Sequence, residues 1–243
     1  MQINLLHGFT QTSTSWDATI VALQEQIPNA TFWAPDMPGH GRGTALPIAL
    51  PEGATALAAA STPGLWIGYS MGGRYLLHIA VQHPEVVKGL VLVSTTAGLD
   101  LALERNERKA ADDALADSIE QDGVPAFLDR WMSLPMFANL RPTAEDLAAR
   151  KLNSGVGLAE SLRQAGTGRQ EPLWNRLDNI RVPTLIVTGE QDLKFSALGE
   201  RLANTIPGSA LEVIPQTGHA VHLEQPQQFS ETVAEWVFTR CNT

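Results

Sequence analysis

Short apolar runs that end in turn residues recur along the chain, separated by longer stretches with helical spacing. This alternation is typical of parallel βαβ units, in which a helix returns the chain to the starting edge of the sheet after each strand. Several runs are apolar throughout, as expected of strands that are buried on both faces. The predicted strands are Ile3–Leu6, Thr31–Ala34, Leu65–Tyr69, Gly89–Ser94, Thr184–Thr188 and Ala210–Ile214.

The stretches between these strands have the spacing expected of helices. Four lie near Trp16–Glu25, Met71–Gln82, Ala197–Thr205 and Pro226–Phe238, and the last begins with proline, which suits the first turn of a helix. An alanine-rich run at residues 54–60 also fits an ordinary helix. We therefore predict an α/β fold with a mostly parallel sheet flanked by helices.

Residues 98–176 interrupt the alternation, because they contain no strand-like run and are rich in Arg, Glu, Asp and Ala at helical spacing. We predict a helical insertion, residues 99–176, in a core built from residues 1–98 and 177–243. In its first helix, Arg108 lies at the centre of an apolar face. A charge in that position must be paired or must face a polar cavity. The apolar members of the face are Leu101, Ala111, Leu115 and Ile119.

The charge balance limits the possible partners. The formal net charge is -9, so the chain would repel a polyphosphate or an anionic membrane surface, and we expect no nucleic-acid partner. No stretch approaches the roughly 20 apolar residues of a membrane span, and the amino terminus lacks a basic region followed by an apolar one. The single cysteine, Cys241, cannot form an internal disulfide. We therefore expect a cytoplasmic protein without membrane insertion.

The segment Gly68-Tyr69-Ser70-Met71-Gly72 lies between a predicted strand and a predicted helix. This is the context of a nucleophile elbow, in which flanking glycines allow a tight turn that exposes the serine hydroxyl. The free N–H groups of the following helix then point toward developing negative charge. Alone the pattern is weak, because small residues recur in many turns.

Two further residues make the elbow significant. Asp192 and His219 each follow a predicted strand, and the carboxyl ends of parallel strands meet at one edge of a sheet. The order Ser, Asp, His along the chain is also that of a known hydrolase fold. We therefore predict a catalytic triad of Ser70, Asp192 and His219. The backbone N–H groups of Phe9, at the end of the first strand, and of Met71 are the predicted oxyanion-hole donors.

Simpler interpretations exist for each triad member. Ser70 could belong only to a turn, Asp192 could only cap the next helix, and His219 could be a loop histidine. That all three residues follow strand ends in this order would be an improbable coincidence. A metal site of His219, His222 and Glu224 would use one short segment with no second ligand cluster, so we expect no metal.

At these residues the chain resembles the α/β hydrolases, through His7-Gly8-Phe9, the segment Asp36–Gly41 and the elbow. A closer resemblance is to the 2-succinyl-6-hydroxy-2,4-cyclohexadiene-1-carboxylate synthases of vitamin K biosynthesis, and it extends into the insertion. The segments that carry it are Gly68–Arg74, Glu104–Arg108, Trp131–Phe137, Gly189–Phe195 and Gly218–His222.

The resemblance implies a helical cap inserted after the sixth strand of the α/β-hydrolase fold. It also implies a lyase that eliminates pyruvate from 2-succinyl-5-enolpyruvyl-6-hydroxy-3-cyclohexene-1-carboxylate, a small anionic substrate, without a cofactor. Ser70 would then act as a base, assisted by His219 and Asp192. The alternatives are an ester or carbon–carbon bond hydrolase that forms an acyl-enzyme with the same triad, and a ligand receptor on the same fold.

The implied substrate carries three carboxylates, so a protein of net charge -9 needs local cations to bind it. Arg74, Arg108 and Arg150 are the predicted binding residues, with Tyr69, Trp131 and Phe137 as further candidates. Each arginine could instead form a structural salt bridge. Because Arg74 lies in the first turn of its helix, where the dipole disfavours a cation, we expect it to have an anionic partner facing the site.

The chain begins almost directly at the strand leading to His7, so the antiparallel hairpin that opens the α/β-hydrolase fold is expected to be absent or curtailed. The strand Thr31–Ala34 would then lie at the sheet edge. Such an edge pairs with a second copy or is covered by a loop, so we expect a monomer or a homodimer.

Overall fold

The computed structural model describes residues 1–42 and 48–241, which form one six-stranded sheet in the order β2-β1-β3-β4-β5-β6. All neighbouring strands are parallel, which confirms the predicted sheet. The alternation of apolar runs placed each strand to within a few residues. The strands are β1 Gln2–Leu6, β2 Thr31–Trp33, β3 Gly64–Tyr69, β4 Val87–Val93, β5 Thr184–Gly189 and β6 Ala210–Ile214.

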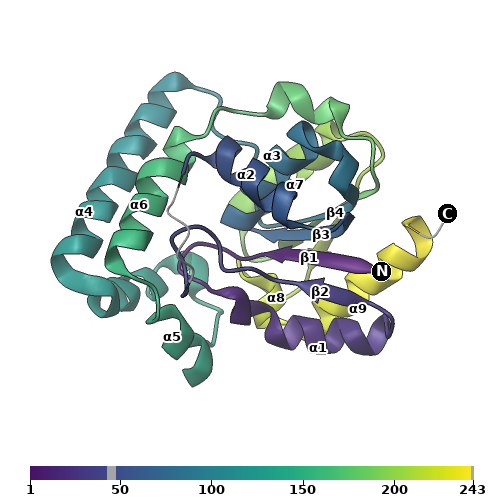
Figure 1. The fold of residues 1–243 in the computed structure, drawn as a ribbon, viewed down its shortest axis with the longest axis horizontal. Coiled ribbons are helices and arrows are strands. Elements are labelled where there is room, and N and C mark those ends of the chain that lie inside the picture. Colours follow the sequence, from purple (N-terminus) through teal and green to yellow (C-terminus); the bar gives the residue numbers. More distant parts are fainter. Residues whose placement is uncertain (43–47, 242–243) are drawn as a thin grey trace.

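Helices cover both faces of this sheet, as Figure 1 shows. One face carries α1 (Asp17–Gln26) and α9 (Pro226–Arg240), whose Leu23 and Val233 pack onto the strands in one apolar core. The opposite face carries α2 (Leu50–Ala60), α3 (Met71–Gln82) and α7 (Leu193–Thr205) over a second core. The central strands β3 and β5 are buried along their whole length, as predicted for strands between two helical layers.

Strand β2 lies at one edge of the sheet and pairs only with β1, as predicted for residues 31–34. Within the described residues no antiparallel hairpin is present. The edge strand is three residues long, and the Trp33 ring packs against Trp66 with 6.1 Å between ring centroids. A short strand with inward-packed aromatic side chains offers little backbone for edge pairing. Association with a second copy stays a prediction.

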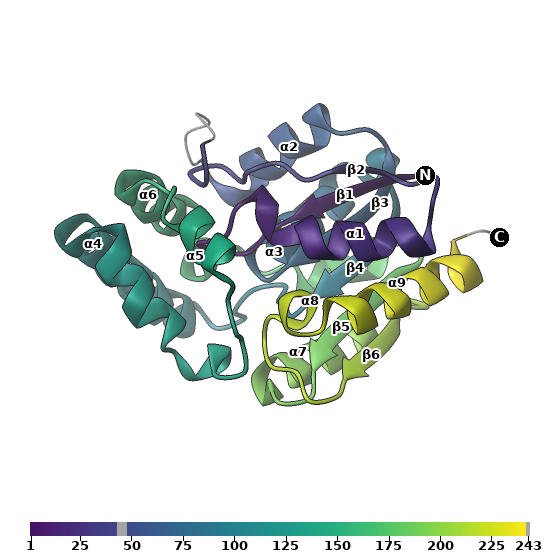
Figure 2. The same cartoon turned by 90° about the horizontal axis from the view of Figure 1, so that it is seen from below.

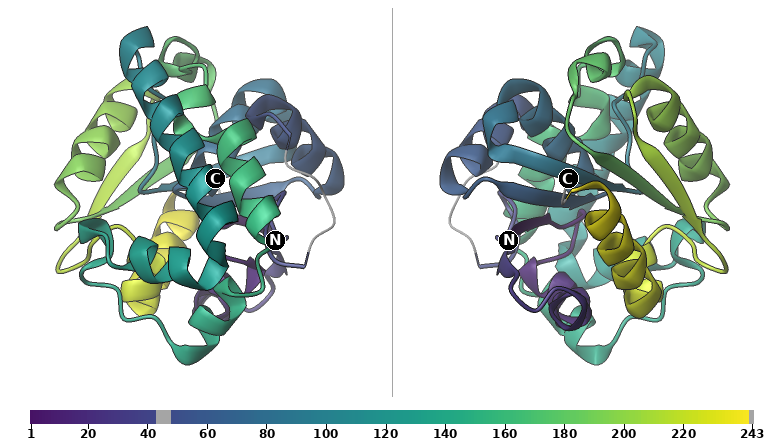
Figure 3. Two further views of the ribbon diagram at one scale, coloured as in Figure 1. Left: turned by 90° about the vertical axis from the view of Figure 1, so that its left-hand side faces the viewer. Right: turned by 90° about the vertical axis from the view of Figure 1, so that its right-hand side faces the viewer.

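Residues 99–176, which we term the cap, lie between β4 and β5 at the carboxyl end of the sheet (Figure 2). Counting the two strands of the opening hairpin, β4 corresponds to the sixth strand of the α/β-hydrolase fold. The cap helices are α4 (Ala102–Met132), α5 (Ala144–Arg150) and α6 (Gly155–Ala165), and α4 packs beside α6 in front of the sheet (Figure 3). A kink divides α4 at Gly123, whose φ of 81° is not helical. Of the helices in residues 1–42 and 48–241, none has the length and hydropathy of a membrane span.

The predicted apolar face of the first cap helix is partly wrong. Leu101 precedes the helix and is 61% exposed, and Ala111 also faces solvent. The buried face instead runs through Asp112, Ala116 and Ile119, so a charged residue belongs to the packed surface. Hydrophobic patterning alone could not identify this face, because it counts Asp as an outward-facing residue.

Four of the five buried histidines predict a loss of stability in mild acid. Burial lowers the pKa of His7 and His222 to about 3, and that of His40 and His78 to about 4. The unfolded chain binds these protons below about pH 6.5, whereas the folded chain does not, so stability falls as the pH drops through this window. The free energy of unfolding should decrease by roughly 8 kcal/mol between pH 7 and 5, because each of the four histidines contributes about 1.4 kcal/mol per pH unit over the roughly 1.5 units below pH 6.5.

Urea titrations at the two pH values measure this difference. Equal free energies of unfolding at pH 7 and pH 5 would show that the four imidazoles are not held neutral by the fold.

Candidate active site

Ser70 occupies a strained turn between β3 and α3. Its backbone has φ 50° and ψ -106°, a conformation that non-glycine residues rarely adopt. Three hydrogen bonds hold it: the Ser70 N–H donates to the Val93 carbonyl at 2.9 Å, and the Ser70 carbonyl accepts the Thr95 hydroxyl at 2.7 Å and the Arg74 N–H at 3.2 Å. A Cβ at Gly72 would lie 2.0 Å from the Leu6 carbonyl oxygen, so only glycine fits there. The turn has the geometry predicted for a nucleophile elbow.

The structure brings Ser70, Asp192 and His219 together. Nδ1 of His219 lies 2.6 Å from Oδ2 of Asp192, and Nε2 lies 3.2 Å from the Ser70 Oγ. A proton on Nδ1 donates to the carboxylate, which leaves Nε2 free to accept from the Ser70 hydroxyl. Asp192 also caps α7, because its Oδ1 accepts the Phe195 N–H at 3.2 Å. The capping and triad interpretations of Asp192 are therefore compatible, since each uses a different oxygen.

The loop after β1 is fixed by the buried imidazole of His7. Nε2 of His7 accepts the Met37 N–H at 2.9 Å, so the ring proton lies on Nδ1, which donates to the Gly8 carbonyl at 2.8 Å. The Gly8 carbonyl also accepts the Gln11 N–H at 3.2 Å. Since the peptide bond is trans, the N–H of Phe9 points away from these donors. Within residues 1–42 and 48–241, no acceptor binds the N–H of Phe9 or Met71.

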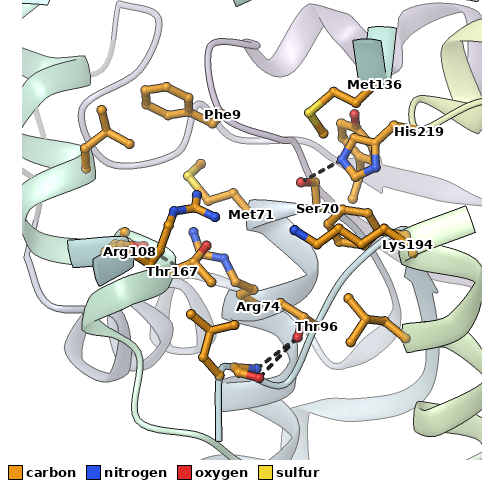
Figure 4. A pocket seen from close by; sticks show the side chains of 18 of the residues that line it. Phe9, Ser70, Met71, Arg74, Thr96, Arg108, Met136, Thr167, Lys194 and His219 are labelled. Atoms are coloured by element: carbon orange, nitrogen blue, oxygen red, sulfur yellow. Dashed lines mark hydrogen bonds between the residues drawn. The ribbon is translucent and has the colours of Figure 1, made fainter. Parts of the chain in front are cut away.

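A cavity of about 560 Å³ lies between the carboxyl end of the sheet and the cap. Ser70 and His219 open onto it, as does each of the predicted oxyanion residues, Phe9 and Met71. Figure 4 shows Ser70 and His219 on one side of this space and Arg108 on the other. All of the predicted binding residues line the cavity, namely Tyr69, Arg74, Arg108, Trp131, Phe137 and Arg150.

Aromatic side chains form much of the wall near the triad. The Trp131 ring packs against Phe9 at 5.4 Å and against Phe137 at 5.9 Å between ring centroids. The ring centroids of Phe195 and His219 lie 4.3 Å apart. Burial raises the pKa of the Tyr69 hydroxyl, so this group stays protonated and can donate a hydrogen bond. The wall therefore combines apolar contact with the exclusion of water around the imidazole.

The three predicted arginines have different partners. Arg108 Nε donates to Asp112 at 2.8 Å, and the nearly buried Arg150 donates to Asp146 at 2.8 Å. Arg74 was expected to have an anionic partner, and this is wrong: its Nη1 donates to a backbone carbonyl, that of Ala165, at 2.7 Å. Among the described residues no carboxylate is within ion-pair distance of Arg74. Burial lowers the pKa of Arg74 to about 10, so it remains charged near neutral pH.

Two further cations at the cavity escaped the sequence analysis. Lys194 and Arg201 both lie on α7 and line the cavity together with Ala197 and Leu198. Arg201 stacks on Trp174 at 3.7 Å from the ring centroid and pairs with Asp100 at 2.6 Å. Their spacing of seven residues places them two turns apart on one helix face, a signal that the sequence contained.

The structure gives no support for a metal site. No group of acidic, histidine or cysteine side chains in the described part of the chain could hold a metal ion. Glu224 instead accepts the N–H groups of Gly218 and Ala220, at 2.6 and 3.0 Å, and thereby shapes the loop that carries His219. The buried His222 ring lies against Trp16 and Tyr69, with ring centroids 4.3 and 4.5 Å apart.

The sequence model of a family described as "Alpha/beta hydrolase family" matches residues 5–232. The chain belongs to the alpha/beta hydrolase family. Its triad order and its elbow between a strand and a helix are those of the alpha/beta hydrolase fold. The family alone does not define the reaction, because alpha/beta hydrolases carry out many chemistries on one scaffold.

Individual relatives are more specific. The "Putative 2-succinyl-6-hydroxy-2,4-cyclohexadiene-1-carboxylate synthase" of Bacillus subtilis (strain 168) is 38% identical over 247 residues, which cover 96% of this chain and 88% of the relative. The 2-succinyl-6-hydroxy-2,4-cyclohexadiene-1-carboxylate synthase of Serratia proteamaculans (strain 568) is 30% identical over 234 residues. The match covers 93% of this chain and 88% of the relative. The solved structure of MenH from S. aureus superposes with a TM-score of 0.90 at 30% identity, covering 98% of this chain and 94% of that one.

Proposed function

We propose that this alpha/beta hydrolase is a 2-succinyl-6-hydroxy-2,4-cyclohexadiene-1-carboxylate synthase. It would eliminate pyruvate from 2-succinyl-5-enolpyruvyl-6-hydroxy-3-cyclohexene-1-carboxylate, without a cofactor. The observation that carries the proposal is the position of the Ser70–His219–Asp192 triad at a cavity lined by five basic side chains. The relatives named above support the same reaction.

The basic lining matches a substrate with three carboxylates. The chain has a net charge of -9, yet the cavity gathers five cations against two acidic side chains, Asp100 and Glu104. A local excess of positive charge in a partly closed cavity attracts anions despite the overall field. A neutral ester has no anionic group for such a lining to bind. The basic residues are Arg74, Arg108, Arg150, Lys194 and Arg201.

The triad supplies the base for the first step. His219 Nε2 takes the hydroxyl proton of Ser70, and Asp192 stabilises the imidazolium that forms. The Ser70 oxygen then removes the ring proton at carbon 2, which is acidic because this carbon bears the succinyl carbonyl. The N–H groups of Phe9 and Met71 donate to the enolate oxygen that develops on this carbonyl.

The elimination follows from the two ring structures. As the enolate carbonyl re-forms, the electron pair from carbon 2 makes the double bond between carbons 2 and 3, and the former 3,4 double bond shifts to carbons 4 and 5. The bond from carbon 5 to the enolpyruvyl oxygen breaks. The departing enolpyruvate takes the proton from the His219 imidazolium and becomes pyruvate, while Ser70 keeps the proton from carbon 2, so the triad returns to its starting state. No bond forms between substrate and protein, and atoms and charges balance without a co-reactant.

A hydrolase would use the same triad differently, and this yields a prediction. An ester hydrolase accumulates or passes through an acyl-enzyme on serine, whereas the elimination needs none. Intact-protein mass spectrometry during turnover of the natural substrate should therefore find only the unmodified mass of the chain while pyruvate is released. A substrate-derived adduct on Ser70 that disappears in step with product formation would favour the hydrolase over the lyase.

The proposal includes the surroundings of the site. The cap, residues 99–176, covers the cavity over the strand ends, and the remaining residues form the core. The partner is a small anionic molecule, not a nucleic acid or a membrane, and the site uses no metal. A cytoplasmic location and a monomeric or homodimeric state complete the proposal, and size-exclusion chromatography with light scattering measures the second.

A further inference from the structure

We infer that Asp112 is a positioning residue that sets two of the cavity's arginines, Arg74 and Arg108, for carboxylate binding. This inference rests on the proposed function for the identity of the ligand. Asp112 lies on α4 and is 2% exposed, and it does not line the cavity itself. A buried carboxylate is costly unless N–H donors satisfy its oxygens. Both of its oxygens have such donors.

The first oxygen orients Arg108. Oδ1 of Asp112 accepts the Arg108 Nε–H at 2.8 Å, and the carboxylate side chain is 3% exposed whereas the Arg108 side chain is 40% exposed. Anchoring Nε leaves the Nη1 and Nη2 end of the guanidinium directed to the cavity, where Figure 4 shows it. The two-pronged end is the part of arginine that matches a carboxylate. Asp112 therefore fixes the direction in which the Nη1 and Nη2 end of Arg108 points.

The second oxygen acts on Arg74 through the backbone. Oδ2 of Asp112 accepts the Gly168 N–H at 3.3 Å in the turn that follows α6. The same turn packs so closely that a Cβ at Gly166 would lie 2.6 Å from Oδ2. The carbonyl of Ala165, at the start of this turn, accepts Arg74 Nη1 at 2.7 Å. Asp112 thus fixes the turn that carries the Ala165 carbonyl, and this carbonyl in turn positions the Arg74 guanidinium.

Charge adds to this arrangement. The Arg74 guanidinium is buried, and it has no carboxylate within ion-pair distance among the described residues. The negative charge of Asp112 acts on Arg74 through space in the stabilising direction, opposite to that of Arg108. The buried carboxylate of Asp112 therefore offsets part of the repulsion that Arg108 exerts on Arg74.

An asparagine cannot replace Asp112, because it offers one acceptor oxygen where two N–H donors need one each. Asp112→Asn turns an NH2 group toward either Arg108 or Gly168. The neighbouring Asp113 supplies a matched control. It also pairs with two cations, Lys109 at 3.4 Å and Arg169 at 2.7 Å, yet none of the three lines the cavity.

Steady-state kinetics with the proposed substrate test the inference. Asp112→Asn should raise KM on the order of tenfold while kcat changes far less, since an unpaired buried donor misplaces the binding groups without touching the triad. Asp113→Asn should leave both constants near those of the parent. In the Arg108→Ala background, Asp112→Asn should raise KM by a smaller factor than it does in the parent, because part of its effect passes through Arg108. The inference would be overturned if the KM factors of Asp112→Asn and Arg108→Ala simply multiplied in the double variant. It would also be overturned if Asp112→Asn and Asp113→Asn changed KM equally.

A crystal structure of Asp112→Asn separates this inference from the proposed function. The Arg108 guanidinium should leave its position in the parent, and the Ala165 carbonyl should turn from Arg74. Unmoved groups would overturn the inference whether or not the protein turns over the substrate, and absent turnover by the parent would contradict only the proposed function. Should Asp112→Asn fail to fold, Asp112→Glu keeps both oxygens but displaces them by one methylene. An unchanged KM and an unmoved Arg108 in that variant would overturn the inference.

Discussion

Ser70→Ala, His219→Ala and Asp192→Asn should each lower kcat for pyruvate release by about two to four orders of magnitude, the usual contribution of a positioned proton-transfer group. Ser70→Ala removes the base, and His219→Ala removes the acceptor 3.2 Å from the serine oxygen. Asp192→Asn offers Nδ1 an amide in place of the carboxylate at 2.6 Å and thereby favours the wrong tautomer of His219. Continuous assay of released pyruvate measures the three rates.

The three losses should not multiply. Members of a triad act as one unit, so Ser70→Ala combined with His219→Ala should be little slower than the slower single variant. Far-ultraviolet circular dichroism and urea titration provide the control for folding. Pyruvate release by a folded Ser70→Ala enzyme at most of the parent's rate would contradict the assigned base.

Replacing a cavity arginine should weaken binding of the transition state by roughly 2 to 4 kcal/mol, the loss expected for a charge-assisted and partly buried contact. Arg74→Ala and Arg108→Ala are the informative variants, and kcat/KM is the quantity to measure. Lysine at either position should recover part of the loss, because it restores the charge without the two-pronged geometry. Arg150→Ala should lower kcat/KM as well, but it also leaves Asp146 without its ion-pair partner.

Arg163→Ala is the matched control for these variants. Arg163 lies on α6, belongs to the cap like Arg108 and Arg150, and pairs with Asp117, Glu120 and Glu160, but it does not line the cavity. Its removal should leave kcat/KM near the parent value. If Arg74→Ala and Arg108→Ala fold and stay within threefold of the parent in kcat/KM, these residues do not hold the substrate.

Much of the core and the triad could be predicted from the sequence, because the signals are local. Strands buried on both faces read as short apolar runs, and β3 and β5 are buried throughout. The elbow requires glycines at fixed positions around Ser70, which a sequence displays directly. The triad partners follow strand ends, so a correct list of strands brings them to one edge of the sheet.

The cap was less predictable, because its contacts are long-range. The partner of Arg74 is the carbonyl of Ala165, 91 residues away, and carries no side-chain signal. The inward face of α4 includes an ion pair between Arg108 and Asp112, which a hydrophobic pattern assigns to the surface. Lys194 and Arg201 show the opposite case: their helical spacing was visible, but only the fold places α7 beside the cavity.

The most direct test of the account is turnover of 2-succinyl-5-enolpyruvyl-6-hydroxy-3-cyclohexene-1-carboxylate by the purified protein. Pyruvate and 2-succinyl-6-hydroxy-2,4-cyclohexadiene-1-carboxylate are measured together, and the kcat/KM of the parent is compared with that for a neutral p-nitrophenyl ester. The account predicts equal amounts of the two products, a kcat/KM of at least about 10⁴ M⁻¹s⁻¹, and much slower ester hydrolysis. Pyruvate release no faster than in buffer, with efficient ester hydrolysis by the same preparation, would contradict it.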